Sequence, residues 1–185
     1  VLADFHADHS YYEYPGGSHW FSNESVDWKP IFDYFKWHKI PLDSMVNEVD
    51  FSTASVGISN QYHWMKILQQ QKAFVYSRVN LKRDLKGASL KGKTENVERI
   101  AVDLKDFKSA STLKLELDSQ FLSIPVSNMQ QVVLLNQGGK WMVSEEEKSG
   151  REKGELRNGG FKEAFNHGMV FVYGTKGTAA ENAWM

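Results

Sequence analysis

The stretch LKLELDSQFLSIP, residues 113–125, decides the fold. Its leucines alternate with Lys114 and Glu116, and this two-residue period is typical of a strand with one buried and one solvated face. Asp118 and Ser119 follow, and residues of this kind favour a reversal of the chain before the second apolar run. The stretch therefore predicts a β-hairpin with one face in a hydrophobic core.

The same strand pattern recurs through the middle of the chain. Ile100, Val102 and Leu104 alternate with polar or small residues, and Gly138-Gly139 can turn the chain between VVLLN and KWMVS because glycine accepts positive φ. Further apolar runs occupy residues 46–53, 61–68 and 73–81. About seven short strands are expected in total, which is the pattern of a β-sandwich or a partial barrel.

The N-terminal part of the chain predicts a strand and then a helix. Residues 1–14 alternate loosely and favour a strand, whereas residues 27–38 have a helical period. Asp27 can cap the first N–H groups of this helix, and Pro30 lies in the first turn, where its missing donor does little harm. The apolar face of the helix consists of Trp28, Ile31, Phe32 and Phe35.

Three other segments have their own signatures. Residues 82–93 are rich in lysine and glycine and predict a solvated hairpin loop. Residues 145–160 are charged, with almost nothing to bury, and predict a linker or a mobile loop. The apolar run 169–173 is followed by glycines and a helix start, which resembles the first βα step of an α/β unit.

Composition excludes several classes of function. The chain has 185 residues, a net charge of −1 and no basic run, so it offers no electrostatic case for binding nucleic acid. No apolar stretch approaches the ~18 residues of a membrane span, and no signal peptide is visible. Cysteine is absent, which excludes disulfides, thiol catalysis and cysteine-bound zinc. No cofactor is predicted, and the oligomeric state is left open.

The segment EYPGGSHWF, residues 13–21, has the features of a catalytic histidine loop. A general-base histidine needs a loop from which its ring can reach a nucleophile on another segment. Gly16 and Gly17 permit a sharp bend just before His19, and the aromatic Trp20 can shield the ring from water. A structural histidine in a turn is the alternative interpretation.

In its context this loop resembles a known family. A strand, the Pro-Gly-Gly-Ser-His-Trp loop and a helix that begins VDWKP, within residues 1–40, resemble the C-terminal end of prolyl-oligopeptidase-like and esterase-like α/β hydrolases. The resemblance implies that His19 is the catalytic histidine, that Trp20 is the substrate-binding aromatic beside it, and that residues 27–38 form the last helix. The chain has no G-x-S-x-G segment, so the nucleophile and the acid are expected upstream of Val1.

With this resemblance the expected fold is α+β and mainly antiparallel β, in three parts. Residues 1–40 would be the C-terminal piece of the hydrolase, 41–144 a β-sandwich-like domain, and 145–185 a charged linker and the start of a further α/β unit. Both ends of the sequence suggest a segment cut from a longer protein. The expected function is that of a C-terminal fragment of a secreted serine peptidase or esterase, periplasmic or extracellular. Its substrate in the intact protein would be a peptide or an ester, and the fragment alone would be inactive.

A non-catalytic module is the second hypothesis. Tyr62 and Trp64 share a face of the predicted strand 61–68, and such aromatic pairs can stack on sugar rings, although core packing is commoner. With Trp141, they would form the exposed aromatic row of a carbohydrate- or protein-binding β-sandwich, with Trp64 as a substrate-binding residue. A purely structural spacer domain is a third possibility.

Two further patterns have simple explanations beside the functional ones. Asp4, His6 and Asp8 would share one face if extended and could ligate a divalent metal, but a polar strand end explains them as well, and no metal site is predicted. Residues 174–178, GTKGT, could cradle an anion on backbone N–H groups, or simply form a tight turn.

Overall fold

The computed structural model describes residues 28–107, 110–126 and 129–144 without interruption and part of the remaining chain. Outside these ranges it describes residues 2–5, 7, 9, 11, 13, 15–19, 153–155, 157, 161, 165, 168–170, 172, 174 and 176–183. The chain divides into two compact units, Val1–Pro41 and Leu42–Met185, and each is described by itself.

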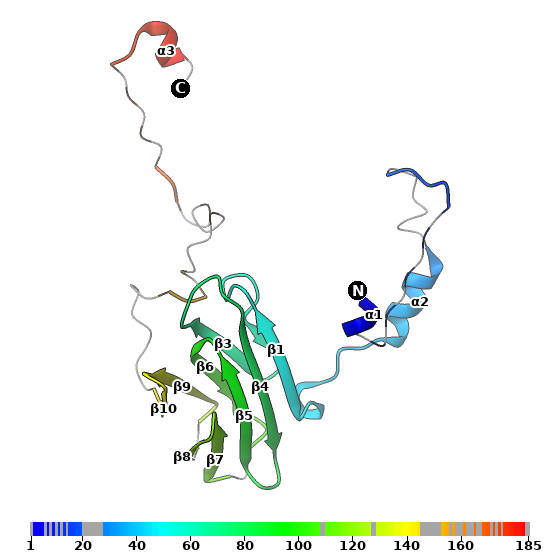
Figure 1. Ribbon diagram of the computed structural model, residues 1–185, viewed down its shortest axis with the longest axis vertical. Helices are drawn as coiled ribbons and strands as arrows, with labels where there is room; N and C mark the ends of the chain where they lie inside the picture. The colour runs from blue at the N-terminus through cyan, green and yellow to red at the C-terminus, as the bar shows by residue number, and fades with distance from the viewer. Residues whose placement is uncertain are drawn as a thin grey trace. The chain divides into compact units, whose positions relative to one another are not determined.

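The second unit folds as two five-stranded β-sheets (Figure 1). The strands of the first sheet are β1 (Glu48–Thr53), β4 (Ser77–Asp84), β5 (Ser89–Glu95), β7 (Thr112–Leu117) and β8 (Gln120–Pro125). Those of the second are β2 (Gln61–Tyr62), β3 (Met65–Gln70), β6 (Val97–Asp103), β9 (Gln131–Gln137) and β10 (Lys140–Val143). Their spatial orders are β1-β4-β5-β7-β8 and β10-β9-β6-β3-β2.

Neighbouring strands are antiparallel, with one exception. The parallel pair is β5 and β7, because the chain crosses to the other sheet as β6 between them. The predicted β-rich and mainly antiparallel domain is therefore confirmed. No helix in the described part of the chain has the length and apolar character needed to cross a bilayer.

The hydrophobic core lies between the two sheets. Alternate residues of strands such as β4 and β7 point into it, as the leucine pattern of residues 113–117 predicts, and both sheets contribute fully buried side chains such as Leu81 and Ile100. Burying an aliphatic side chain of this size contributes about 1.5–3 kcal/mol. The sandwich is therefore held together mainly by residues that the two-residue period identifies.

Both predicted hairpin turns are present. Asp118 and Ser119 have φ of 50° and 66°, and Gly138 and Gly139 have φ of 60° and 86°. Positive φ at both central residues is the type I′ geometry, whose twist matches that of the flanking strands. The turn chemistry in the sequence therefore fixes the register of β7 with β8 and of β9 with β10.

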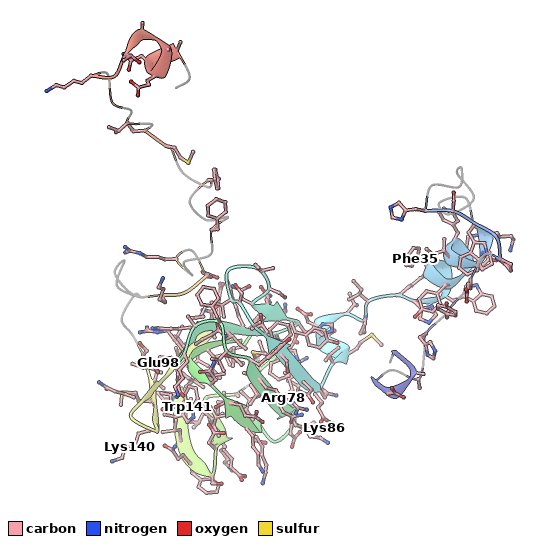
Figure 2. The ribbon with its side chains drawn as sticks, turned by 45° about the horizontal axis from the view of Figure 1, so that its top comes forward. Phe35, Arg78, Lys86, Glu98, Lys140 and Trp141 are labelled. Atoms are coloured by element: carbon pink, nitrogen blue, oxygen red, sulfur yellow. The ribbon has the colours of Figure 1, made fainter. Side chains whose placement is uncertain are left out.

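The Asp118 turn is anchored by side chains from both sheets. The Asp118 carboxylate accepts hydrogen bonds from the Thr94 backbone N–H at 2.7 Å, the Thr94 hydroxyl at 2.7 Å and the Trp141 Nε1–H at 2.8 Å. These bonds satisfy the indole N–H of the buried Trp141, which Figure 2 labels, and they hold the turn to β5 and β10. The carboxylate of a turn residue, Asp118, thus links the two sheets at one end of the sandwich by accepting hydrogen bonds from both.

One predicted strand is in fact two. The prediction of a single strand over residues 61–68 is wrong, because Gln61 pairs with Lys66 and the chain reverses between β2 and β3. His63 has a φ of 51°, a left-handed conformation that histidine adopts more readily than most side chains. Tyr62 and Trp64 consequently do not share a strand face.

The predicted loop at residues 82–93 is wrong as well. This segment forms the end of β4, a turn, and most of β5. The inward positions of β5 are Leu90, Gly92 and Thr94, which form too weak an apolar pattern to predict a strand. The lysines on the opposite face lie in a paired strand rather than in a free loop.

The first unit departs from its predicted strand. Leu2–Phe5 form a helical turn, α1, instead of a strand. An isolated strand leaves its backbone groups without partners, and the described residues of this unit contain no other strand to pair with it. The predicted helix is confirmed as α2 (Lys29–Trp37), whereas the proposed cap Asp27 lies outside the described residues.

The charged segment predicted as a linker makes specific contacts with the sandwich. Gly154 is buried and forms a β-bridge with Arg157. Glu155 between them makes an ion pair with Lys66 and accepts a hydrogen bond from Asn60 Nδ2 at 2.8 Å. These described residues therefore dock on the sandwich beside β3, so the interpretation as a free linker does not hold for them.

The C-terminal α/β pattern is only partly present. Residues 169, 170 and 172 are not in a strand, so the predicted strand 169–173 is wrong at its described positions. The predicted helix start is α3 (Ala179–Ala183). The Thr178 backbone N–H donates to Glu181 Oε2 at 2.8 Å, and the Glu181 N–H donates to Thr178 Oγ1 at 3.3 Å, which is a capping box. The Thr178 N–H is thus committed to a side chain within the helix and not to an anion.

Candidate functional site

The histidine loop is exposed in the structure. Pro15 and Gly16 form a turn in which Gly16 has a φ of 77°, as the predicted glycine-dependent bend requires. His19 follows two residues after Gly17, and its side chain lies at the surface of the first unit rather than in a core. An exposed imidazole on such a loop can exchange a proton with a group on another segment.

Several residues of the predicted site lie outside the described part of the chain. Among them are Trp20, the predicted substrate-binding aromatic beside the histidine, and the candidate metal ligands His6 and Asp8. The remaining candidate, Asp4, lies in α1 and not in an extended strand. Within the described residues, no group of three histidine or acidic side chains is arranged to hold a metal ion.

The helix after the loop has an apolar face that its own unit leaves exposed. Phe35 on this face (labelled in Figure 2) is 61% exposed. Phe32, one turn earlier, is also exposed. The opposite face carries charges: Lys29 pairs with Asp33 and holds the pKa of its carboxyl below the usual value. A helix with one apolar stripe and one charged face is typical of an element that covers a larger core.

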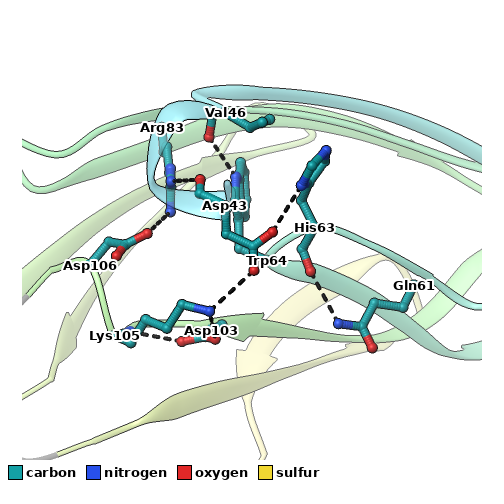
Figure 3. A network of polar contacts seen from close by, with 9 residues as sticks. All are labelled: Asp43, Val46, Gln61, His63, Trp64, Arg83, Asp103, Lys105 and Asp106. Carbon is teal, nitrogen blue, oxygen red and sulfur yellow. Dashed lines mark hydrogen bonds and ion pairs between the residues drawn. The ribbon is translucent and has the colours of Figure 1, made fainter. Parts of the chain in front are cut away.

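A network of polar contacts surrounds Asp43, the first residue of a short 3₁₀ helix, η2 (Asp43–Met45) (Figure 3). The Asp43 carboxylate lies 2.8 Å from Nδ1 of the buried His63 and 3.1 Å from the Lys105 ammonium. Lys105 also pairs with Asp103 at 3.1 Å. The hydrogen bond from His63, followed by that from Lys105, lowers the pKa of the Asp43 carboxyl.

Arg83 completes this network from β4. Its guanidinium is buried, donates to Asp106 Oδ2 at 3.0 Å and also donates to the Asp43 backbone carbonyl. It lies 4.9 Å from the ring centroid of Trp64, whose Nε1–H donates to the Val46 carbonyl at 2.8 Å. Residues 43–46, which lead into β1, are therefore clamped to the sandwich by one arginine, one histidine and one tryptophan.

The His63–Asp43 pair has the orientation of a catalytic dyad but no nucleophile. Among the described residues, no serine or threonine hydroxyl is hydrogen-bonded to His63. The other contacts of Asp43 hold η2 in place: its carboxylate accepts a hydrogen bond from the Lys105 ammonium, and its backbone carbonyl accepts one from the Arg83 guanidinium. We therefore assign this pair a structural role.

The predicted aromatic row is absent from the described surface. Trp64 is 2% exposed and Trp141 is buried too, so neither indole offers a ring face to a ligand. This burial conflicts with the prediction of Trp64 as a substrate-binding residue. The exposed Tyr62 stacks instead on Phe51, with ring centroids 6.1 Å apart and planes 4° from parallel. The strand tryptophans serve the core, because each indole N–H has a partner inside the fold.

Sequence reasoning missed the Asp43 network because its members are far apart in the chain. His63 lies 20 residues from Asp43, and Lys105 lies 62 residues from it. The only local signal was the polar, proline-preceded segment before β1, which has no periodicity. Such a cluster becomes visible only when the strand order is known.

Comparison with known proteins gives no relative for this chain: no family model, no curated protein and no solved structure matches it. Any function must therefore be argued from its own residues.

Proposed function

We propose that this chain is the C-terminal part of a secreted serine hydrolase, a peptidase or an esterase, with His19 as its general base. The observation that carries the proposal is the exposed His19 after the positive-φ turn at Gly16, followed by helix α2. The uncovered apolar face at Phe32 and Phe35 supports it, because the last helix of an α/β hydrolase packs that face on a sheet. The β-sandwich would be an accessory domain.

In the intact protein, the chemistry would follow the serine-hydrolase scheme. The His19 imidazole accepts the proton of an upstream serine hydroxyl as its oxygen attacks the substrate carbonyl carbon. The imidazolium then donates that proton to the leaving amine or alcohol as the carbonyl–heteroatom bond breaks. Water, activated by the same imidazole, hydrolyses the acyl-enzyme. The chain itself contains no nucleophile elbow, so it is expected to be inactive alone.

The test uses the polypeptide that includes the residues upstream of Val1. His19→Asn is expected to lower hydrolysis of p-nitrophenyl esters or aminoacyl p-nitroanilides by about 10³-fold or more, because the serine loses its base. The matched control is His9→Asn, since His9 is another exposed histidine of the same unit. Labelling by a fluorophosphonate probe should fall with His19→Asn and not with the control.

Two results would overturn the proposal. One is an upstream sequence without a G-x-S-x-G segment between a strand and a helix pattern. The other is a folded His19→Asn protein that hydrolyses its substrate at the wild-type rate. Unchanged thermal unfolding of the variant would show that a loss of activity is not a loss of fold.

A further inference from the structure

The solvent face of the first sheet holds a pocket of about 470 Å³ that crosses four strands, β1, β4, β5 and β7. Apart from Gly92 it is lined by polar and charged residues, whose side chains present both carbon stems and charges of both signs, and these residues include Asp84 and Arg83. The side chains that matter here are Glu48, Asn80, Lys82, Lys91, Lys93 and Glu116. None of them belongs to the histidine loop or to the Asp43 network.

Four of these side chains form one row across the sheet. The strand register places Glu48 opposite Lys82, Lys82 opposite Lys91, and Lys91 beside Glu116. The outer pairs make contact: Lys82 Nζ lies 3.7 Å from Glu48 Oε2, and Lys91 Nζ lies 2.8 Å from Glu116 Oε2. The row therefore reads negative, positive, positive, negative.

The centre of the row brings two ammonium groups together, each with a glutamate only on its outer side. Lys82 and Lys91 are directly opposite each other on antiparallel strands, and like charges in that position destabilise a sheet. Lys93 adds a third ammonium on the same face, opposite the neutral Asn80, and makes no ion pair within the described residues. An anionic group bound among the three lysines would relieve this repulsion.

The flanking carboxylates indicate what else the ligand must carry. Glu48 and Glu116 would repel a densely charged polyanion such as a nucleic acid, but they can accept hydrogen bonds from hydroxyl groups. Three strand spacings separate β1 from β7, about 14 Å, which suits an extended ligand rather than a single ion. An oxyanion carried on a chain of polyhydroxylated rings satisfies both requirements.

We propose that this face of the sandwich binds an acidic oligosaccharide, with its carboxylate or sulfate group held by Lys82, Lys91 and Lys93. Hydroxyl groups on either side of that anionic group donate hydrogen bonds to Glu48 and Glu116. The site does not depend on the role of His19, and it lies on the solvent face rather than on the core tryptophans.

The test is isothermal titration calorimetry of the full chain with tetragalacturonate at low salt, beside a heparin-derived tetrasaccharide and neutral cellotetraose. At least one acidic probe is expected to bind with a Kd below about 1 mM, and cellotetraose is expected not to bind. Affinity should fall as salt rises, because the lysines are exposed. The carboxylated and sulfated probes distinguish the two sources of the oxyanion.

Variants assign the binding to this face. Lys82→Gln combined with Lys91→Gln is expected to weaken binding at least tenfold. Lys86→Gln is the matched control, since Lys86 is an exposed lysine in the turn between the same two strands and does not line the pocket (Figure 2). The double variant relieves the repulsion between the two lysines but loses their exposed ion pairs with Glu48 and Glu116, and surface pairs of this kind contribute little, so the thermal unfolding temperature is expected to change little and weaker binding would not reflect unfolding.

Three outcomes overturn the inference: no binding of either acidic probe, equal binding of cellotetraose, or undiminished binding by the double variant. Binding of inorganic phosphate as tightly as the acidic probes would also overturn it, because the hydroxyl contacts would then contribute nothing. All of these outcomes leave the hydrolase proposal untouched, since that proposal is tested by hydrolysis and not by glycan affinity.

Discussion

Leu113 and Phe35 are large apolar residues on regular elements, and they are found in opposite surroundings. Leu113 on β7 is 0% exposed, whereas Phe35 on α2 is 61% exposed. The sandwich supplies both layers of its own core, while the helix of the first unit has an apolar face without a layer to cover it among the described residues. The difference shows that the sandwich buries its large apolar residues between its own layers, whereas the first unit leaves those of α2 at the surface.

The sharpest way to test this comparison is to truncate both side chains. Leu113→Ala is expected to lower the free energy of unfolding of the sandwich by about 2–5 kcal/mol, because it leaves a cavity in a packed core. Phe35→Ala in the same chain should change it by less than about 0.5 kcal/mol, since an exposed ring has little packing to lose. Urea unfolding followed by tryptophan fluorescence measures both.

Equal losses for the two variants would contradict the comparison, because Phe35 would then be packed in solution. A second measurement sharpens the comparison: the effect of Phe35→Ala in a longer polypeptide that includes residues upstream of Val1. If the helix covers a hydrolase sheet there, the same substitution should destabilise that longer protein by more than 1 kcal/mol, an estimate for a buried aromatic truncation.

Two glycines allow a second comparison between the units. A Cβ at Gly92 on β5 would lie 2.0 Å from the Asn80 carbonyl oxygen and 2.7 Å from Leu81 Cδ2, so β4 and β5 would have to move apart. Gly92→Ala is therefore expected to cost about 1–3 kcal/mol of sandwich stability. Chemical denaturation reports the loss as a lower midpoint.

Gly16→Ala is the matched variant in the first unit. Apart from the glycine and its two chain neighbours, no atom lies within 4 Å of a Cβ built at Gly16, so the free-energy cost of alanine there arises from the backbone φ of 77°. A left-handed conformation costs a non-glycine residue about 1–2 kcal/mol locally, which should bend the histidine loop without shifting the unfolding of the sandwich. Equal stability of the sandwich in Gly92→Ala and Gly16→Ala would contradict the prediction that β4 lies too close to Gly92 for a side chain.

The smallest expected effect concerns pH. The pKa of Asp43 is lowered in the folded state from its ordinary value of 3.8, mainly by the hydrogen bond from His63. A carboxyl with a depressed folded pKa stabilises the fold above its unfolded pKa, and this contribution is lost as the pH falls through the folded pKa. Asp43→Asn should therefore flatten part of the decline in sandwich stability below about pH 4.

Asp33→Asn is the control for this prediction. The pKa of Asp33 is also lowered, by Lys29, but both residues belong to the exposed helix α2 of the first unit. Its removal should leave the pH dependence of sandwich unfolding unchanged. If the stability of the sandwich depended on pH identically in wild type and Asp43→Asn, the ionised Asp43 carboxylate would contribute nothing to that stability.

Local patterns predicted much of the sandwich, and long-range contacts explain what they missed. The hairpins at Asp118 and Gly138 could be predicted because alternation and turn residues lie side by side in the sequence. The reversal at His63 could not, since its left-handed backbone is supported by a carboxylate 20 residues away. The strand over residues 1–14 failed because a strand needs a neighbour that the sequence pattern cannot supply.

The candidate sites show the same contrast between features that a local sequence pattern predicts and features that depend on long-range contacts. The bend before His19 was predictable from the glycines, whereas the partners that would make the histidine catalytic are not in this sequence. The opposition of Lys82 and Lys91 could not be predicted, because it depends on the register of two strands whose outer faces carry no hydrophobic signal. The burial of Trp64 likewise depends on Arg83 and Val46.

The clamp at Asp43 has a consequence for modularity. Among the described residues, the side chains that fasten η2, namely Arg83, His63 and Lys105, all lie on the sandwich side of Pro41. A protease that cuts the exposed residues 38–42 should therefore release the sandwich with its first strand still seated. Because these attachments are all internal to the sandwich, the sandwich could be joined to other domains by gene fusion without any change to residues 43–46.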